Sequence, residues 1–451
     1  MYTCGVTVYD ECHIGHARSL YIFDVMRRYL SYRGFRVQLV RNITDVDDKI
    51  INRAKELKIN WSELTEKCVK SYYHDLDSLK ISKADYEPRA TENIPEMIKH
   101  IEGLIAKGYA YTTETGVYFR VRDFKDYGKL SGQGIDEMRS GARKEPDETK
   151  EDALDFALWK KSKPDEPFWE SPWGKGRPGW HIECSVMSAK YLKTETMDIH
   201  AGGRDLIFPH HENEIAQSEA LSGKLFARYW LHHGLLTINS QKMAKSLGNF
   251  ITIKDFIEKH HNADFLKLFF LSAHYAHPMD YTDKKIEEAR TALERFHILL
   301  RKARLIVRDQ RAPVIRLPIE TVDFIEKHKQ RFIEALDDDF NTPIALSCLF
   351  DLASETNKFI DSEKHNPRYT EVIYQACEDT ILELGNKIFG LFDDLSWEPL
   401  NDEEKSLLEE RLKARQNKDF KASDSFREEL RKRGIIAEDT KDGQSYRRIL
   451  R

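Results

Sequence analysis

The fold is decided by residues 1–16, MYTCGVTVYDECHIGH. Valine and tyrosine, which are favoured in strands, recur over residues 6–9, so this stretch begins as a buried strand. Residues 10–13 interrupt the pattern, and apolar residues then recur at helical spacing over residues 17–32. Gly34 is a typical helix stop. We therefore predict a strand that leads through a tight turn into a helix.

The turn between this strand and helix has the features of a nucleotide-phosphate site. Unpaired backbone N–H groups and the helix dipole favour an anion at a helix N-terminus. Gly15 permits the close approach of a ligand, and His13 and His16 beside it can donate hydrogen bonds to phosphate oxygens. The alternative is an ordinary strand, turn and helix in which both histidines are surface or capping residues.

The composition limits the classes of protein to which the chain can belong. A chain of 451 residues favours about three domains, and 33% charged with 40% hydrophobic residues is typical of globular proteins. The net charge of −5 means that any nucleic-acid surface must be local. The six cysteines have no framework spacing, which indicates reduced thiols and a cytoplasmic location. Because no apolar run approaches roughly 18 residues and no leader pattern opens the chain, we expect neither a membrane span nor a secretory signal.

The next segment completes a βαβ unit. Residues 37–40 have the pattern of a second strand, which predicts a parallel sheet with ligand at the C-terminal ends of its strands. Asp45, Asp47 and Asp48 follow that strand. They are able to bind a metal ion, but such a run more often caps the next helix, here expected over residues 50–57.

The middle of the chain departs from this alternation. We predict a hairpin over residues 109–121. The charged, glycine-rich residues 122–163 are expected to be an insertion in the first domain rather than core. Residues 164–180, rich in Trp, Pro and Gly, predict an ordered loop with packed aromatic rings.

A polar cluster follows in residues 208–214, FPHHENE, after a predicted helix that ends at Leu192 and a strand over residues 197–200. Pro at the second position of the cluster suits the first turn of a helix. His210 and Glu214 then lie one turn apart on the same face, a spacing that can offer two ligands to one metal ion. The alternative is a polar, solvated face.

A lysine-containing loop follows a strand predicted over residues 230–238. Its residues 239–249, NSQKMAKSLGN, carry Lys242 and Lys245. Flexible lysine loops can close over phosphate and stabilise charge that develops during nucleotidyl transfer. The alternative is a plain surface loop.

The remainder of the chain is predicted to be mainly helical. Residues 411–451 are locally basic, and we expect a helix pair followed by a small hairpin there. Tyr446 amid arginines suits a nucleic-acid surface, against the alternative of a solvated charged helix. The preceding helices are expected over residues 253–260, 263–273, 283–307, 318–336, 343–362, 369–389 and 402–416.

Together these stretches resemble the cysteinyl-tRNA synthetase family of class I aminoacyl-tRNA synthetases. Their order and spacing match the family along nearly the whole chain. The resemblance is carried by Cys4–Asp10 running into His13–His16, Arg41–Lys49, Arg177–Cys184, Phe208–Glu214 and Lys242–Asn249.

The resemblance implies a fold class and a domain order. An α/β Rossmann-type catalytic domain with a parallel sheet precedes an all-helical bundle and a small α+β anticodon-binding region. The implied parts are a catalytic domain at 1–240 with an insertion at about 109–175, a lysine-loop and stem-contact region at 241–310, a helical bundle at 311–400, and an anticodon-binding domain at 401–451.

The family pattern also implies one zinc ion on Cys4, Cys184, His210 and Glu214, and these are sound zinc ligands. The sulfur of the substrate cysteine would join them, because its thiol, with a pKa of about 8.5, ionises on metal binding. The hydroxyl of serine is much harder to ionise. Serine would therefore be rejected without an editing domain.

The implied reaction is ATP-dependent ligation of L-cysteine to tRNA(Cys) through a cysteinyl-adenylate, with magnesium accompanying ATP. His13, Gly15, His16 and Lys245 would hold ATP, with Lys242 in support. The other implied residues are Thr44, Trp180 and His200 at the amino-acid pocket, and Asp424, Arg427 and Asp439 at the anticodon. A monomer is expected.

The sequence departs from the family pattern at several places. The family carries a longer segment before the strand holding Cys4, so an edge strand is missing or the start is misplaced. Ala201 replaces a glycine, Ala244 a serine and Tyr446 a tryptophan. Two alternatives stay open: the related cysteine ligase of mycothiol synthesis, and a tRNA-binding paralogue without activity.

Overall fold

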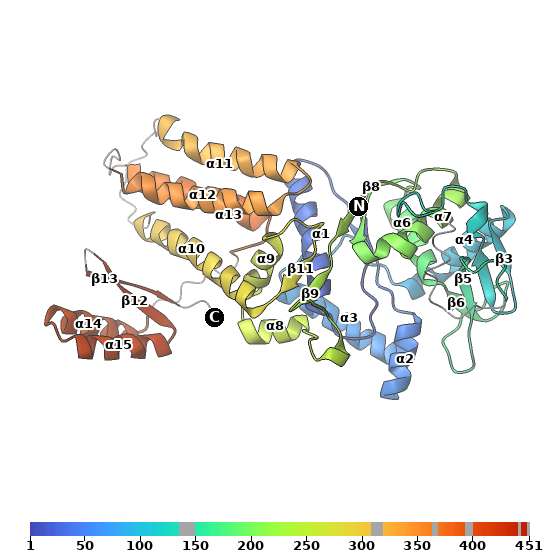
Figure 1. Ribbon diagram of the computed structural model, residues 1–451, viewed down its shortest axis with the longest axis horizontal. Coiled ribbons are helices and arrows are strands. Elements are labelled where there is room, and N and C mark those ends of the chain that lie inside the picture. Colours follow the sequence, from blue (N-terminus) through green and yellow to red (C-terminus); the bar gives the residue numbers. More distant parts are fainter. Residues whose placement is uncertain (135–148, 308–318, 363–368, 393–399, 441–442, 449–451) are drawn as a thin grey trace. The chain divides into compact units, whose positions relative to one another are not determined.

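The computed structural model describes residues 1–134, 149–307, 319–362, 369–392, 400–440 and 443–448 (Figure 1). The chain forms two compact units. The first contains Met1–Phe256 and Ala273–Tyr281, and the second contains Ile257–Ser272 and Thr282–Arg451. Among the described residues, no helix has the length and apolar character needed to cross a membrane.

A parallel sheet forms the centre of the first unit. Strand β1 (Tyr2–Thr3) lies between β2 (Val40–Arg41) and β7 (Met197–Gly203), and β8 (Ala227–His233) pairs with the other edge of β7. Helix α1 (Ile14–Tyr32) connects β1 to β2. This confirms the predicted βαβ unit and the Rossmann-type α/β class.

The opening strand is shorter than predicted. β1 ends at Thr3, and the chain then runs beside the residues that follow β2, with Val8 N donating to Thr44 O at 3.1 Å. Gly5 is required there, because a Cβ on it would lie 1.5 Å from the carbonyl oxygen of Asn42. The helix begins at Ile14 rather than at residue 17, because the residue before it, His13, is its N-cap.

The aspartate run after β2 caps a helix, as one of its two interpretations predicted. Asp47 is the N-cap of α2 (Asp48–Leu57) and accepts from Lys49 N at 2.8 Å. Asp45 accepts from the hydroxyl of Thr91 at 2.6 Å. Further along lie α3 (Trp61–Ser78), a short 3₁₀ turn (Ala90–Asn93) and α4 (Ile94–Ala106).

The insertion forms an antiparallel sheet, and part of it belongs to the core. The predicted hairpin is confirmed as β3 (Ala110–Thr112) and β4 (Gly116–Phe119), and the sheet continues with β5 (Phe156–Lys161) and β6 (Gly176–Pro178). The prediction that residues 122–163 stay outside the core was wrong for β5, because its consecutive side chains Leu158 and Trp159 are both fully buried in the core. Residues 135–148 lie outside the described part of the chain.

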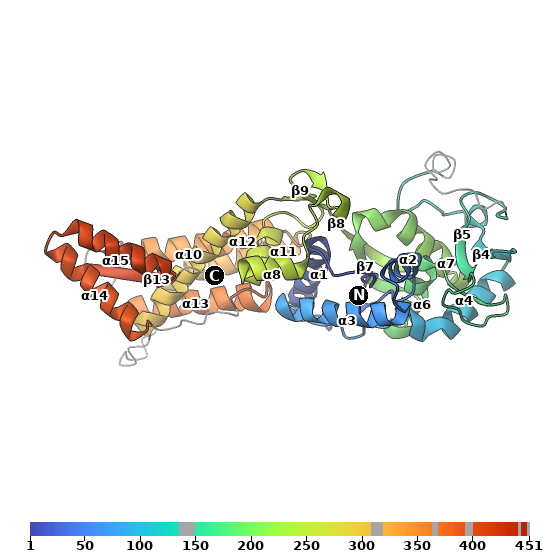
Figure 2. The same ribbon diagram turned by 90° about the horizontal axis from the view of Figure 1, so that it is seen from below.

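Two helices bring the polar clusters to the sheet. The loop predicted over residues 164–180 was wrong at its end, because β6 occupies residues 176–178 and helix α6 (Trp180–Leu192) follows it directly. Helix α7 (Glu212–Ser222) follows β7. Both views show α4, α6 and α7 beside the insertion's sheet (Figures 1 and 2).

The strand predicted over residues 230–238 is interrupted at Gly234. A Cβ there would lie 2.2 Å from the carbonyl oxygen of His277. After this break, β9 (Leu236–Ile238) joins a small sheet with β10 (Gln241–Lys242) and β11 (Met279–Tyr281). The guanidinium of Arg18, fully buried in α1, donates to the carbonyls of residues 234, 235, 275 and 277 and so ties α1 to this sheet.

The second unit is the predicted helical region, with most boundaries within two residues of the predicted ones. Its C-terminal part packs a helix pair against a hairpin around buried Leu408, Leu430 and Ile435. Its elements, with α8 at the boundary, are α8 (Ile253–His260), α9 (Ala263–Leu271), α10 (Asp283–Val307), α11 (Ile319–Asp337), α12 (Thr342–Ile360), α13 (Thr370–Lys387), α14 (Asp402–Gln416), α15 (Phe420–Lys432), β12 (Ile435–Thr440) and β13 (Gly443–Arg448).

Candidate functional site

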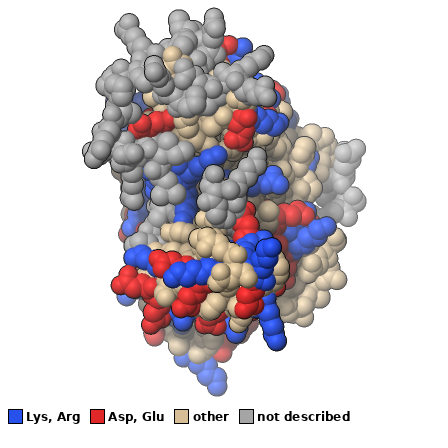
Figure 3. Space-filling view, turned by 90° about the vertical axis from the view of Figure 1, so that its left-hand side faces the viewer, with Lys and Arg blue, Asp and Glu red and all other residues tan. Residues whose placement is uncertain are grey.

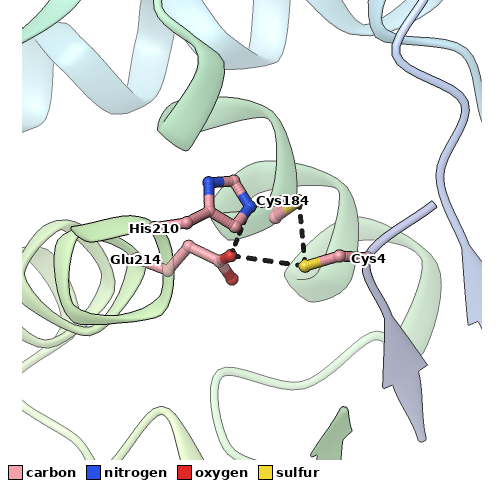
Figure 4. A group of neighbouring side chains, drawn as sticks. All are labelled: Cys4, Cys184, His210 and Glu214. Atoms are coloured by element: carbon pink, nitrogen blue, oxygen red, sulfur yellow. Dashed lines mark hydrogen bonds and ion pairs between the residues drawn. The ribbon is translucent and has the colours of Figure 1, made fainter. Parts of the chain in front are cut away.

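Four side chains predicted as metal ligands meet at one edge of the parallel sheet (Figure 4). Cys4 Sγ lies 3.9 Å from Cys184 Sγ and 3.6 Å from Glu214 Oε1, and Cys184 Sγ lies 3.6 Å from His210 Nε2. Tetrahedral ligands about 2.0–2.3 Å from one zinc ion stand about 3.3–3.8 Å apart, so these separations suit such an ion. Three of the four side chains are fully buried and Cys4 is half-buried.

A second group of possible ligands overlaps the first. It shares Cys4 and Glu214 and adds His200 and His211. His211 Nε2 lies 3.4 Å from Cys4 Sγ, and its Nδ1 is hydrogen-bonded to His232 at 2.9 Å. His200 Nε2 contacts the outer carboxylate oxygen of Glu214 at 2.6 Å. A histidine that contacts a ligating carboxylate from behind orients it, which is a common supporting arrangement.

The buried cluster strongly perturbs its own ionisation. Burial would lower the pKa of His210, but the Glu214 carboxylate and the Cys184 sulfur raise it to about 10. Burial would raise the pKa of the Cys184 thiol, but its contacts with Cys4 and His210 lower it to about 6. Burial raises the pKa of Cys4 well above its usual range. In the absence of a metal the cluster thus favours a Cys184 thiolate beside a protonated His210, and zinc binding would release protons from His210 and Cys4.

The chain between β7 and α7 is not the regular helix that the proline predicted. The Phe208–Pro209 bond is cis and Phe208 has an extended backbone, so regular helix begins only at Glu212. The prediction that His210 and Glu214 share a face is confirmed, with Nε2 and Oε1 2.9 Å apart. The irregular turn also directs His211 into the cluster.

Aromatic rings enclose the cluster on one side. Trp180 stacks on the ring of His210, with centroids 4.1 Å apart, and is 38% exposed. His181 Nδ1 is hydrogen-bonded to His210 Nδ1 at 2.9 Å, which leaves Nε2 of His210 facing the sulfur atoms. Trp180 therefore lies beside the cluster, and its place in the wall of an amino-acid pocket stays a prediction.

Thr44 lies close to the same cluster. Its hydroxyl donates to Glu183 Oε2 at 2.7 Å and accepts from Asn42 Nδ2 at 3.2 Å, and all three side chains are buried. Asn42 Oδ1 also lies 3.7 Å from Cys184 Sγ. Burial raises the pKa of Glu183 well above its usual range. Asn42 was missed from the sequence, although its place at the end of β2 was a usable signal.

The N-terminus of α1 carries the predicted nucleotide residues. His13 is its N-cap, and its Nδ1 accepts from Gly15 N at 3.0 Å and His16 N at 3.3 Å. His16 Nδ1 in turn accepts from His13 N at 3.3 Å. Burial lowers the pKa of His13 to about 4 and that of His16 well below its usual range. Both rings are therefore neutral, with the proton on Nε2, and are capping residues as well as possible phosphate donors.

The low pKa of His13 leads to a prediction about acid stability. An unfolded histidine takes up a proton below about pH 6.5, but the folded one does so only near 4, so stability is lost as the pH falls between these values. Relative to wild type, His13→Asn keeps a good cap that does not titrate. Between pH 7.5 and 5, wild type is expected to lose up to about 2 kcal/mol more than the variant in urea unfolding. Parallel pH curves would contradict this.

The lysine loop lies against this helix N-terminus. Lys245 Nζ forms an ion pair with Asp10, which lies in the turn before α1. Ala244 N donates to Asn249 Oδ1 at 2.8 Å, and Asn249 Nδ2 donates to Lys242 O at 3.1 Å, so the loop is closed on itself. Lys242 is exposed. The two predicted ATP motifs are therefore adjacent.

The predicted tRNA-contact residues lie in the second unit. Asp424 and Arg427 are exposed on α15. The carboxylate of Asp439 on β12 instead accepts from Arg411 at 3.0 Å and Arg415 at 2.9 Å. Both arginines lie on α14, so this carboxylate also joins the hairpin to that helix. On the face that Figure 3 shows, Lys and Arg are interspersed with Asp and Glu.

The ring of Tyr446 on β13, predicted as a stacking surface, is partly covered. The guanidinium of Arg301 on α10 lies 3.9 Å from its centroid.

Three family models match the chain: tRNA synthetases class I (C) catalytic domain over residues 1–291, the DALR domain over 331–393, and the cysteinyl-tRNA ligase anticodon binding domain over 398–447.

Similar curated proteins are cysteine–tRNA ligases. That of Thermodesulfovibrio yellowstonii is 49% identical over 98% of this chain and 93% of its own length. That of Aquifex aeolicus is 46% identical over 99% and 94%.

The fold is shared with a solved class I enzyme. Mycobacterium tuberculosis methionyl-tRNA synthetase in complex with methionyl-adenylate superposes with a TM-score of 0.69 at 16% identity, over 86% of this chain and 91% of that one. At this identity the likeness concerns the fold alone. From the family models and the relatives, the chain belongs to the cysteine–tRNA ligase family of class I aminoacyl-tRNA synthetases.

Proposed function

We propose that the chain activates L-cysteine with ATP as a cysteinyl-adenylate and transfers it to tRNA(Cys), using zinc to select the substrate thiolate. One observation carries this proposal. Cys4, Cys184, His210 and Glu214 come from separate parts of the chain, yet their ligand atoms lie within 4.8 Å of one another. Two sulfurs, an imidazole and a carboxylate form a zinc-type donor set.

A bound zinc ion would supply a Lewis acid that stabilises thiolate strongly and alcohol poorly. The chain's residues would do the rest. Trp180 would close one side of the amino-acid pocket, and Thr44 and His200 would line or support it.

ATP would bind at the N-terminus of α1, together with magnesium. His13 and His16 would donate Nε2–H groups to phosphate oxygens, and Gly15 would let the nucleotide approach the backbone. Lys245, with Lys242 in support, would stabilise the departing pyrophosphate as the cysteine carboxylate attacks the α-phosphate.

The proposed contacts with tRNA are those that membership of this family implies. The second unit would contact the tRNA, with Asp424, Arg427 and Asp439 near its anticodon. The predicted domain boundaries, the monomeric state and the cytoplasmic location remain predictions.

The zinc assignment is tested by metal content. Wild-type protein should contain one zinc per chain, and Cys184→Ser should lose it, because a serine hydroxyl is a poor zinc ligand. Cys68→Ser is a matched control, since Cys68 belongs to neither ligand group. Full zinc in Cys184→Ser would overturn the ligand set.

The activity is tested separately by charging a tRNA(Cys) transcript with labelled cysteine. Charging by wild type is expected. A chain that binds the transcript but neither charges it nor exchanges pyrophosphate would be an inactive paralogue, and the proposed reaction would be wrong.

A further inference from the structure

Helix α7, which carries Glu214, is bound by a turn from the insertion. Residues 127–131, here called the docking turn, lie far from α7 in sequence. Glu212, the first residue of α7, is fully buried. Its Oε1 accepts from Gly128 N at 2.9 Å, and its Oε2 accepts from Leu130 N at 3.2 Å and Ser131 N at 2.9 Å. Three backbone amides of one turn therefore surround one carboxylate.

Two further contacts join the docking turn to the same helix. The hydroxyl of Tyr127 donates to Asn213 Oδ1 at 2.5 Å, and both side chains are buried. Lys129 forms a surface ion pair with Glu219 at 2.5 Å. The contacts made by Glu212 and Asn213 matter for stability, because burying a carboxylate or an amide without hydrogen-bond partners raises the free energy of the folded state.

The position of Glu212 gives these contacts a consequence for the metal ligands. It lies between His210 and Glu214, at the point where the irregular turn becomes regular helix. His210 precedes that helix, so regular helical hydrogen bonding does not by itself fix its direction. An anchor at the first residue of α7 would set the orientation of both ligands at once.

We propose that Glu212 is a positioning residue that couples the insertion to the metal ligands, an inference that rests on the proposed zinc site. The docking turn holds the Glu212 carboxylate, and this fixes the angle at which His210 and Glu214 face the two sulfurs. Residues that support metal ligands in this way typically contribute 10- to 100-fold to metal affinity.

The test compares Glu212→Gln with Glu219→Gln. A glutamine at 212 keeps the size of the side chain but turns an NH₂ group toward backbone N–H donors, so one side of the anchor is lost. We expect about 10-fold weaker zinc binding, measured by competition with a chelating dye. The d–d bands of the cobalt-substituted protein should also change. The KM for cysteine should rise while the KM for ATP stays the same. Glu219→Gln loses the ion pair with Lys129, while its amide oxygen can still accept from Phe226 N, so its zinc binding should match wild type.

Each outcome decides the matter. If Glu212→Gln binds zinc and cobalt like wild type, the inference is overturned, even if its stability falls. If it does not fold, Glu212→Asp takes its place, because it keeps the carboxylate but shortens its reach to the three amides; a shifted cobalt spectrum supports the inference and an unchanged one overturns it. If wild type itself takes up no cobalt, the proposed zinc site has failed instead.

Discussion

Replacing Lys245 with alanine is expected to lower the kcat of cysteine-dependent ATP–pyrophosphate exchange about 100- to 1000-fold, the usual effect of removing one group that stabilises developing charge. The side chain is 52% exposed, and its ammonium group pairs with Asp10 in the turn before α1. This places the cation next to His13 and His16 before any nucleotide is bound. A phosphate could therefore take over the pair with little movement of the loop.

Two variants separate the charge from the loop. Lys242→Ala should lower kcat about 10-fold, because that side chain is exposed and its backbone carbonyl, which Asn249 holds, is unchanged. Lys245→Arg keeps a cation and should retain more activity than the alanine variant. The Lys245→Ala substitution should lower kcat more than it changes the KM for ATP, as expected when the lost interaction is made mainly in the transition state. Near-wild-type exchange would remove Lys245 from this role.

The order of helices and strands was accessible from the sequence because it depends on local pattern. Apolar periodicity predicted the bounds of α10 and α14 correctly. The four-residue spacing of His210 and Glu214 predicted their shared face, since that relation needs only one helical turn.

Relations between distant segments were much less accessible. His211 was missed because neighbouring residues in a regular helix do not point the same way, and only the irregular turn at residues 207–211 brings both histidines to the cluster. Glu212 was missed because its partners are backbone amides 81 to 84 residues away, and backbone amides carry no sequence signal. The core position of β5 was hidden by the charged residues around it.

Removing the metal with a chelator is expected to reduce cysteine-dependent exchange about 100- to 1000-fold while leaving ATP affinity unchanged. The physical reason is that the two sites share no described side chain. The candidate ATP groups belong to α1, the turn before it and the lysine loop, whereas the candidate ligands follow β1 and lie on α6, in the turn before α7 and on α7. Without the metal, the buried cluster offers a substrate thiol no Lewis acid, and effects of about 3–4 kcal/mol follow from losing one such electrostatic partner.

Serine distinguishes selection by metal from selection by pocket size. A site built to hold a specific polar group rejects an analogue lacking it by about 10⁴- to 10⁵-fold. The holo protein should therefore prefer cysteine over serine by about this factor, and chelation should lower the preference by the same factor as the cysteine rate, because the serine rate does not change. Returning zinc should restore both rate and preference, and measured ATP binding serves as the control for folding. If the preference were unchanged in metal-free protein, discrimination would reside in the walls of the pocket, with Trp180 the first residue to examine.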